Sequence, residues 1–192
     1  MSMSRFEFCL KEVLQYEGGF VNHPKDPGGA TNKGVTIGTF RLHYPGSSIQ
    51  DLLNITDEQV ALIYKKGYWD KIDGDGLGPG VDLAVFDYAV NSGVGRARKE
   101  FRKVMKFHRV DDKKLVDLLC SNRLSFLKGL SIWSTFGKGW SRRVERVRLL
   151  GMRDAGTTSV TKVSIPKPEE APAKGFDLLT TILDFIMRIF FK

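Results

Sequence analysis

Apolar residues at helical spacing recur along most of the first 154 residues, and one turn-rich segment interrupts them. Phe6, Cys9 and Val13 follow the three- and four-residue spacing of one helix face. Similar stretches fall at 56–68, 83–93, 96–107, 112–130 and 140–150. Residues 20–38 instead hold two prolines and four glycines, which favour turns or a short hairpin. The pattern predicts a mainly α (α+β) domain with a turn-rich hairpin segment near its N-terminus.

The chain divides into three parts, since 192 residues leave room for one domain and a short appendage. We expect residues 1–154 to form the helical domain. Residues 155–175 lack periodicity and hold three of the seven prolines, which indicates a linker. Residues 176–192 are apolar with one polar stripe and are shorter than the roughly 20 residues of a membrane span. They predict an amphipathic helix that contacts a membrane surface, another protomer or the domain itself.

Charge is unevenly distributed along the chain. Residues 1–95 carry 8 Lys and Arg against 12 Asp and Glu, whereas residues 96–156 carry 17 against 6. A strongly basic half favours a polyanionic partner such as nucleic acid, acidic lipid or an anionic cell wall. The basic residues fall on amphipathic helices, where a solvated face is a better explanation than base reading, so no specific nucleic acid is expected.

Several chemistries are poorly supported. Two cysteines make no disulfide scaffold, and Cys9 falls on an apolar helix face. The three histidines lack the HExxH spacing, so a zinc amidase is poorly supported, and the segment that begins at Asp73 lacks the later ligands of a calcium loop. We therefore expect neither a metal site nor a cofactor.

Glu17 is the strongest candidate for an acid catalyst. The pattern places it in the last turn of the first helix, where the helix dipole disfavours a carboxylate. Together with apolar neighbours, this position would raise the pKa of Glu17 and favour a protonated carboxyl, as a general acid requires. An exposed glutamate at a frayed helix end is the alternative.

The residues that follow Glu17 resemble the N-terminal signature of glycoside hydrolase family 108, the peptidoglycan-cleaving lysozymes of bacterial and phage genomes. The shared features are a Glu-Gly-Gly-aromatic run at 17–20, then Asn22, Pro24, Asp26 and the triplet Gly34-Val35-Thr36. The resemblance continues through three further segments, 63–69, 86–93 and 139–143. It implies a lysozyme-like fold with Glu17 as the catalytic acid.

The resemblance also suggests further site residues. Phage-type lysozymes outside the family place an Asp after eight residues and a Thr after five more; in this chain Asp26 fits and Thr31 comes one residue early. Asp26 is therefore a second catalytic candidate or an Asp-Pro turn former, and Thr36 is an alternative to Thr31. Substrate binding is expected for these threonines and for Tyr68, Trp69 and Asn91. Core packing for the aromatic residues and a helix C-cap contact for Asn91 are the alternatives.

These features predict an N-acetylmuramidase that cleaves the β-1,4 bond between N-acetylmuramic acid and N-acetylglucosamine in peptidoglycan strands. The alternative is a non-catalytic wall- or partner-binding protein on the same fold. The N-terminus shows no uninterrupted apolar run typical of a cleaved secretory signal. We expect synthesis in a bacterial cytoplasm and action in the periplasm or cell wall, with residues 176–192 as a contact to the inner membrane.

Overall fold

The computed structural model describes residues 3–22, 29–107 and 110–156. Eight α-helices and one antiparallel pair of short strands make up this part of the chain. The elements are α1 (Arg5–Leu14), β1 (Thr31–Asn32), β2 (Val35–Thr36), α2 (Ile37–His43), α3 (Ile49–Leu53), α4 (Asp57–Tyr64), α5 (Val81–Ser92), α6 (Val94–Phe107), α7 (Asp112–Lys128) and α8 (Trp133–Asp154). A π-helix, Lys65–Trp69, extends α4, and two 3₁₀ turns follow it at Asp70–Ile72 and Gly74–Gly76. The mainly α fold with a hairpin is thereby confirmed.

Side-chain caps set the starts of several helices. Ser4 and Glu7 form a capping box at α1, and Thr56 with Gln59 forms another at α4. Asp111 caps α7, and its carboxylate accepts a hydrogen bond from the Lys114 N–H at 2.8 Å. These caps satisfy N–H groups that have no partner inside their helices.

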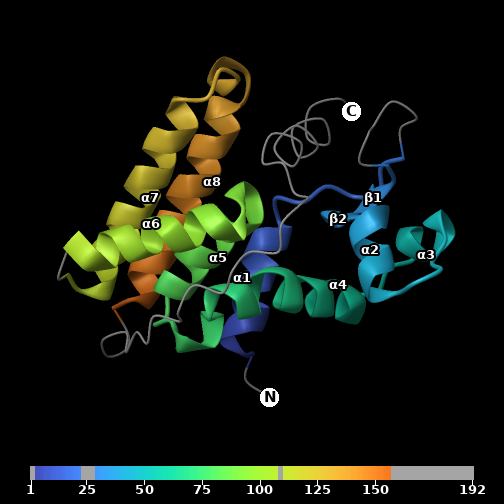
Figure 1. Cartoon of the computed structure of the whole chain (residues 1–192). Helices are drawn as coiled ribbons and strands as arrows, with labels where there is room; N and C mark the ends of the chain where they lie inside the picture. The colour runs from blue at the N-terminus through green and yellow to red at the C-terminus, as the bar shows by residue number, and fades with distance from the viewer. Residues whose placement is uncertain (1–2, 23–28, 108–109, 157–192) are drawn as a thin grey trace.

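The core of the larger lobe forms around α5, which contacts α1, α6, α7 and α8 (Figure 1). Every residue of α5 except Val90 is buried, including two acids. Asp82 at the start of α5 is fully buried and bonds to Arg5 of α1, with Nε 2.8 Å from Oδ2. Because a buried carboxylate is costly without a partner, this ion pair ties α1 to the central helix.

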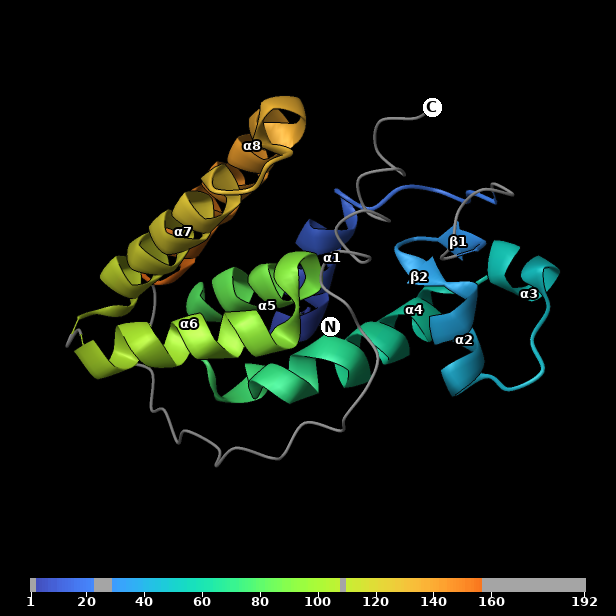
Figure 2. The same cartoon turned by 45° about the horizontal axis from the view of Figure 1, so that its top comes forward.

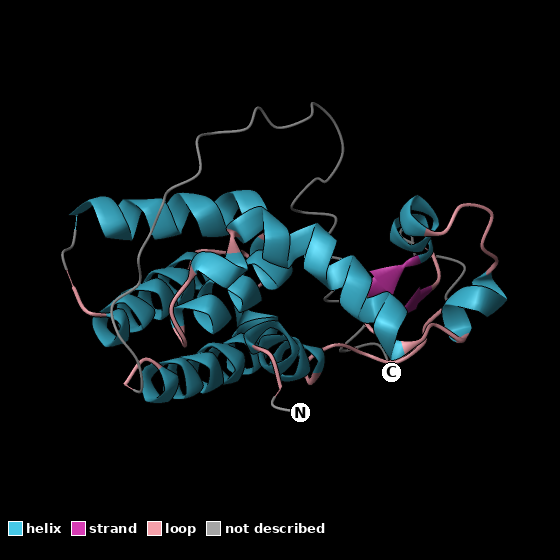
Figure 3. Ribbon diagram, turned by 90° about the horizontal axis from the view of Figure 1, so that it is seen from below, coloured by secondary structure: helices cyan, strands magenta, loops and turns pink. Residues whose placement is uncertain are grey.

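The smaller lobe holds the hairpin, α2 and α3, and α4 runs from the helical bundle towards it (Figures 2 and 3). Thr31 pairs with Thr36 and Asn32 with Val35 across the two strands. Lys33 and Gly34 between them both have positive φ, at 47° and 75°, as a type I′ turn requires. The buried Asn32 donates to the Leu53 carbonyl at 2.9 Å, which fastens the hairpin to α3.

Two segments expected from the sequence lie largely or wholly outside the described residues. The proposed linker lies outside the described residues except for its first two positions, and the expected helix at 176–192 lies wholly outside them. Within residues 3–156, leaving aside the two gaps, no helix is both long and apolar enough to cross a membrane.

Candidate functional site

Glu17 lies in the turn that follows α1, at the junction of the two lobes. The structure ends α1 at Leu14, so Glu17 is beyond the last helical turn rather than inside it. Its N–H still donates to the Leu14 carbonyl at 3.1 Å, which keeps it at the carboxyl end of the helix. The side chain is only 7% exposed, so the alternative of an exposed, frayed glutamate is wrong.

The hairpin turn approaches the Glu17 carboxylate closely. A Cβ atom added to Gly34 would lie 2.8 Å from Glu17 Oε2 and 2.2 Å from the hydroxyl oxygen of Tyr64. Tyr64, the last residue of α4, donates its hydroxyl hydrogen to the Lys33 carbonyl at 3.1 Å. Only a glycine leaves room for the carboxylate and the phenol to meet this turn.

Arg143 of α8, in the larger lobe, also contacts the Glu17 carboxylate. Its Nη1 lies 3.4 Å from Glu17 Oε1, and its Nη2 lies 2.8 Å from Asp87 Oδ1. Arg123 of α7 completes the group, with Nη1 2.5 Å from Asp87 Oδ2. All four side chains are at most 7% exposed. Two arginines and two carboxylates from separate elements therefore form one buried, charge-balanced network.

The opposite charges of this network shift the pKa values of Asp87 and Arg143 in the direction that favours their ionised forms. Burial by itself raises the pKa of Asp87, but Arg143 and Arg123 outweigh burial, and the net pKa lies below its ordinary value. Burial lowers the pKa of Arg143, whereas Asp87 and then Glu17 raise it, with a net rise. Arg143 thus stabilises negative charge on Glu17 and opposes the effect expected from the helix end.

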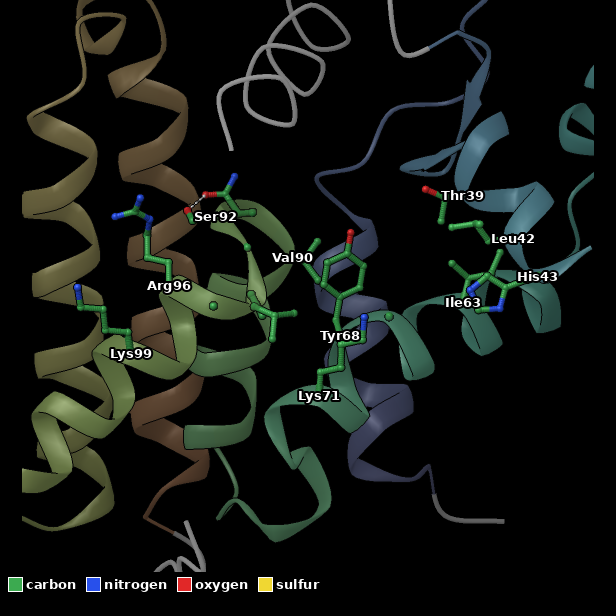
Figure 4. A pocket seen from close by; sticks show the side chains of 16 residues that line it. Thr39, Leu42, His43, Ile63, Tyr68, Lys71, Val90, Ser92, Arg96 and Lys99 are labelled. Atoms are coloured by element: carbon green, nitrogen blue, oxygen red, sulfur yellow. Dashed lines mark hydrogen bonds between the residues drawn. The ribbon is translucent and has the colours of Figure 1, made fainter. Parts of the chain in front are cut away.

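A pocket of about 660 Å³ opens between the lobes. None of the four network side chains is among its lining residues, but Asn91 lines the pocket and bonds to Arg123 of the network. Figure 4 shows Thr39, Leu42 and His43 on the side of the smaller lobe, with Ser92, Arg96 and Lys99 opposite. Tyr68 lies between them and lines the pocket. Its ring centroid is 5.5 Å from that of Tyr64, which connects the pocket to the surroundings of Glu17.

The two aromatic candidates differ in placement. Tyr68 is partly exposed in the pocket, where its ring is available to a sugar. Trp69 is fully buried, stacks edge-on against Phe6 and Phe86 with centroids 5.4 Å away, and donates from Nε1 to Asp75 Oδ1 at 2.9 Å. Neighbouring core residues cover the Trp69 ring, which favours the alternative of core packing, and a contact of Trp69 with substrate stays a prediction.

Asn91 lines the pocket and is 7% exposed. Its Oδ1 accepts hydrogen bonds from Arg123 Nη2 at 3.0 Å and from the Ser92 hydroxyl at 3.1 Å. Since a guanidinium only donates, the atom that faces Arg123 must be the oxygen, and Nδ2 is left as a donor. Asn91 thus bonds to Arg123, while Gly93 is the C-cap of α5. The bond links the pocket wall to the buried network.

The two threonines face each other in the hairpin. Thr31 is 1% exposed, and its hydroxyl lies 3.4 Å from the Gly29 carbonyl oxygen. Thr36 caps α2, with its Oγ1 accepting from the Thr39 N–H at 3.0 Å. Neither contact tests a role in substrate binding, which stays a prediction for both. Asp26 lies outside the described residues, so its catalytic role also stays a prediction.

The sequence reasoning missed two site residues: it assigned the basic segment that holds Arg143 to a solvated face, and it did not consider Arg123. A signal was available for Arg143, because it is three residues from Trp140 and four from Val147 on the apolar stripe of α8. A charged residue on such a stripe needs a buried partner of opposite charge. Asp87, between apolar residues of α5, is the matching signal.

No group of three or more His, Cys, Asp and Glu side chains among the described residues is arranged to hold a metal ion. The side chains that the structure places at this junction are carboxylates, arginines, an amide and phenols.

Comparisons with a family model and with solved structures both gave matches to this chain. A family model described as Glycosyl hydrolase 108 matches residues 10–93, which include Glu17, the hairpin, Tyr68 and Asn91. The chain is similar to a solved structure of SagA from Brucella abortus, with 38% identity over 78% of this chain and 95% of that one and a TM-score of 0.67. No curated protein sequence matches. The match to the family's model and the extent of this likeness show that the chain belongs to glycosyl hydrolase family 108.

Proposed function

We propose that this protein is an N-acetylmuramidase that hydrolyses the β-1,4 bond between N-acetylmuramic acid and N-acetylglucosamine, with Glu17 as general acid. Membership of the family supports a glycan as substrate and peptidoglycan as its class. The observation that carries the proposal is the placement of Glu17. Its carboxylate is nearly buried at the lobe junction, held between the hairpin turn and Arg143. It does not itself line the pocket, to which Tyr64 and its neighbour Tyr68 connect it.

The contact with Arg143 has two opposing effects on a general acid: it disfavours the protonated carboxyl that must donate, and it stabilises the carboxylate that remains after donation. When protonated Glu17 donates to the leaving oxygen, it becomes a carboxylate whose charge Arg143 already faces at 3.4 Å. For the fraction of the protein in which Glu17 is protonated, this interaction is stronger after proton transfer than before it and therefore favours the transition state. Asp87 and Arg123 hold Arg143 in place for this role.

The glycan strand is proposed to lie along the pocket between the lobes. Tyr68 offers an aromatic face to a sugar ring, and Asn91 Nδ2 offers a donor to an N-acetyl oxygen. Asp26 is proposed to assist at the far face of the sugar, as its spacing from Glu17 suggests. Action on this substrate would take place in the periplasm or cell wall.

The Glu17→Gln variant tests the proposal. Glutamine keeps the shape of the side chain but has no proton to transfer, so cleavage of purified peptidoglycan should fall by about 100-fold or more. Clearing of turbidity and the release of reducing sugar ends measure the rate. Mass spectrometry of the products identifies the bond that is cut.

Glu12→Gln is the matched control, because Glu12 is on α1 and its carboxylate pairs with Arg146 at 3.4 Å, away from the pocket lining. This variant should keep the wild-type rate. Near wild-type cleavage by a folded Glu17→Gln protein would sink the catalytic assignment. A wild-type protein that pellets with peptidoglycan yet releases no reducing ends would instead support the non-catalytic, wall-binding alternative.

A further inference from the structure

The ionisable side chains of one sign predominate in the lining of the pocket between the lobes, and that sign is positive. Its lining includes Lys71, Arg96 and Lys99 together with His43, and it includes no carboxylate. None of these three cations forms an ion pair with a carboxylate among the described residues, whereas Lys33, Lys65 and Lys114 elsewhere on the surface do. Unpaired cations around one pocket create a positive potential that favours an anionic ligand.

Donors gather at the end of the pocket where α5 passes into α6. Asn91 is 93% buried in that wall, and the contact of its Oδ1 with Arg123 leaves Nδ2 as a donor. The backbone of residues 93–95 also lines this end, and the first N–H groups of the 14-residue α6 have no partner within the helix. An amide, a helix N-terminus and cationic side chains together make a site for an oxyanion.

Arg96 is positioned for such a ligand. It lines the pocket, and its guanidinium carbon lies 3.9 Å from the ring centroid of Phe126 in α7, a stacking that restrains the side chain. Lys99 follows three residues later on the same face of α6, and Figure 4 shows both cations on the same side of the pocket.

We propose that this end of the pocket binds a carboxylate of the peptide attached to muramic acid, an inference that rests on the proposed function. A glycan backbone of N-acetylglucosamine alone carries no negative charge, whereas the peptide of peptidoglycan carries carboxylates next to the sugar chain. Binding of this group would select glycan strands that bear peptides over uncharged strands. Phosphate of a wall polymer shares the same anionic chemistry and is distinguished by the test.

The experiment measures binding by calorimetry to the full chain. The ligand is the disaccharide–peptide that muramidase cleavage releases, which the wild-type protein does not cut further. The comparison ligand is the same compound with its peptide carboxylates converted to amides. The wild-type protein should bind the carboxylate form about tenfold more tightly, as expected for loss of one charge-assisted contact. An Arg96→Gln/Lys99→Gln double variant should bind both forms equally.

Two matched variants sharpen the result. Lys106→Gln removes a cation from α6 that does not line the pocket, so it should keep the tenfold ratio. Lys99→Gln alone should reduce the ratio without disturbing the stacking of Arg96 on Phe126. Inorganic phosphate at the concentration of the disaccharide–peptide should not displace it.

Equal binding of the two forms by the wild-type protein, or an unchanged ratio in a folded double variant, would overturn the proposal. Displacement by phosphate at equal concentration would likewise overturn it in favour of a general anion site. Because the readout is binding, it is separate from the test of Glu17. Loss of the ratio with normal cleavage rejects only the peptide site, and loss of cleavage with the ratio intact rejects only the catalytic assignment.

Discussion

The Gly34→Ala substitution tests the packing of the hairpin turn against the site. Gly34 has φ of 75°, and an added Cβ would meet Tyr64 and Glu17 at the distances given above. A methyl group this close must displace the phenol, the carboxylate or the turn. The change therefore acts on stability and on the position of the proposed acid at once.

The magnitude follows from two contributions. An alanine in the left-handed region costs about 1–2 kcal/mol. Overpacking beside Tyr64 and Glu17 adds about 1–3 kcal/mol, so the free energy of unfolding should fall by about 2–5 kcal/mol. A displacement of the Glu17 carboxylate by about 1 Å would also lower the cleavage rate of the folded protein by about 100-fold.

Gly46→Ala is the matched control. Gly46 has φ of 83°, and a Cβ there would meet nothing within 4 Å. It should show only the backbone cost of about 1–2 kcal/mol and keep full activity. The gain from a less flexible unfolded chain is common to both variants and cancels in their comparison.

Urea denaturation gives the two stabilities, and peptidoglycan clearing by the folded protein gives the two rates. In the Gly34→Ala background, Tyr64→Phe removes the oxygen nearest the new methyl group and should recover part of the lost stability. The reasoning is refuted if the two glycine variants are equally destabilised and equally active, because the close approach of Gly34 would then have no energetic consequence.

Three further predictions concern buried groups and the pocket. Two arginines hold the pKa of Asp87 below its ordinary value despite burial, so the stability it contributes is present above the unfolded-state pKa of about 3.9 and is lost as pH falls towards the folded value. Asp87→Asn should cost about 3–5 kcal/mol at pH 7 and flatten this acid dependence in urea titrations at several pH values; an unchanged pH profile would contradict it. Burial raises the pKa of Cys120 to about 12 and raises that of Cys9 further. Iodoacetamide at pH 8 should therefore label both thiols far more slowly in the native protein than in urea, and mass spectrometry measures the extent of labelling. Tyr68→Ala should lower peptidoglycan cleavage about tenfold with little loss of stability, whereas Trp69→Phe should cost about 1–3 kcal/mol and leave the rate per folded molecule unchanged. The reverse pattern would show that the two aromatic roles are misassigned.

Six of the helices could be predicted from local sequence because their causes are local, whereas the short α2 and α3 and the first turns of α8 were not expected. Each capping box, at Ser4 and at Thr56, spans four residues and marks the start of a helix. The glycine at position 93 likewise marks the end of α5. A turn or short hairpin was expected from the glycines and prolines of residues 20–38, and the observed turn needs positive φ at two adjacent positions. The resemblance also singled out Glu17 without knowledge of its surroundings.

The assembly of the site was decided by tertiary structure. Arg143 and Glu17 are 126 positions apart, and only the packing of α8 against α5 and α1 brings them within 3.4 Å. Their pairing depends on a third residue, Asp87, so no spacing within one segment predicts it. The same holds for Gly34, whose need for a hydrogen side chain arises from a carboxylate and a phenol that distant elements supply.

The aromatic pair after α4 shows the division most clearly. Sequence alone identified Tyr68 and Trp69 as adjacent aromatic residues, either of which could pack inward or face a sugar. The π-helical turn and the neighbouring α5 direct Trp69 into the core and Tyr68 into the pocket. Local sequence determines which residues are available to a site, because propensities and caps act over a few residues. Tertiary packing determines which of them reach it, because burial and ion pairing depend on elements far apart in the chain.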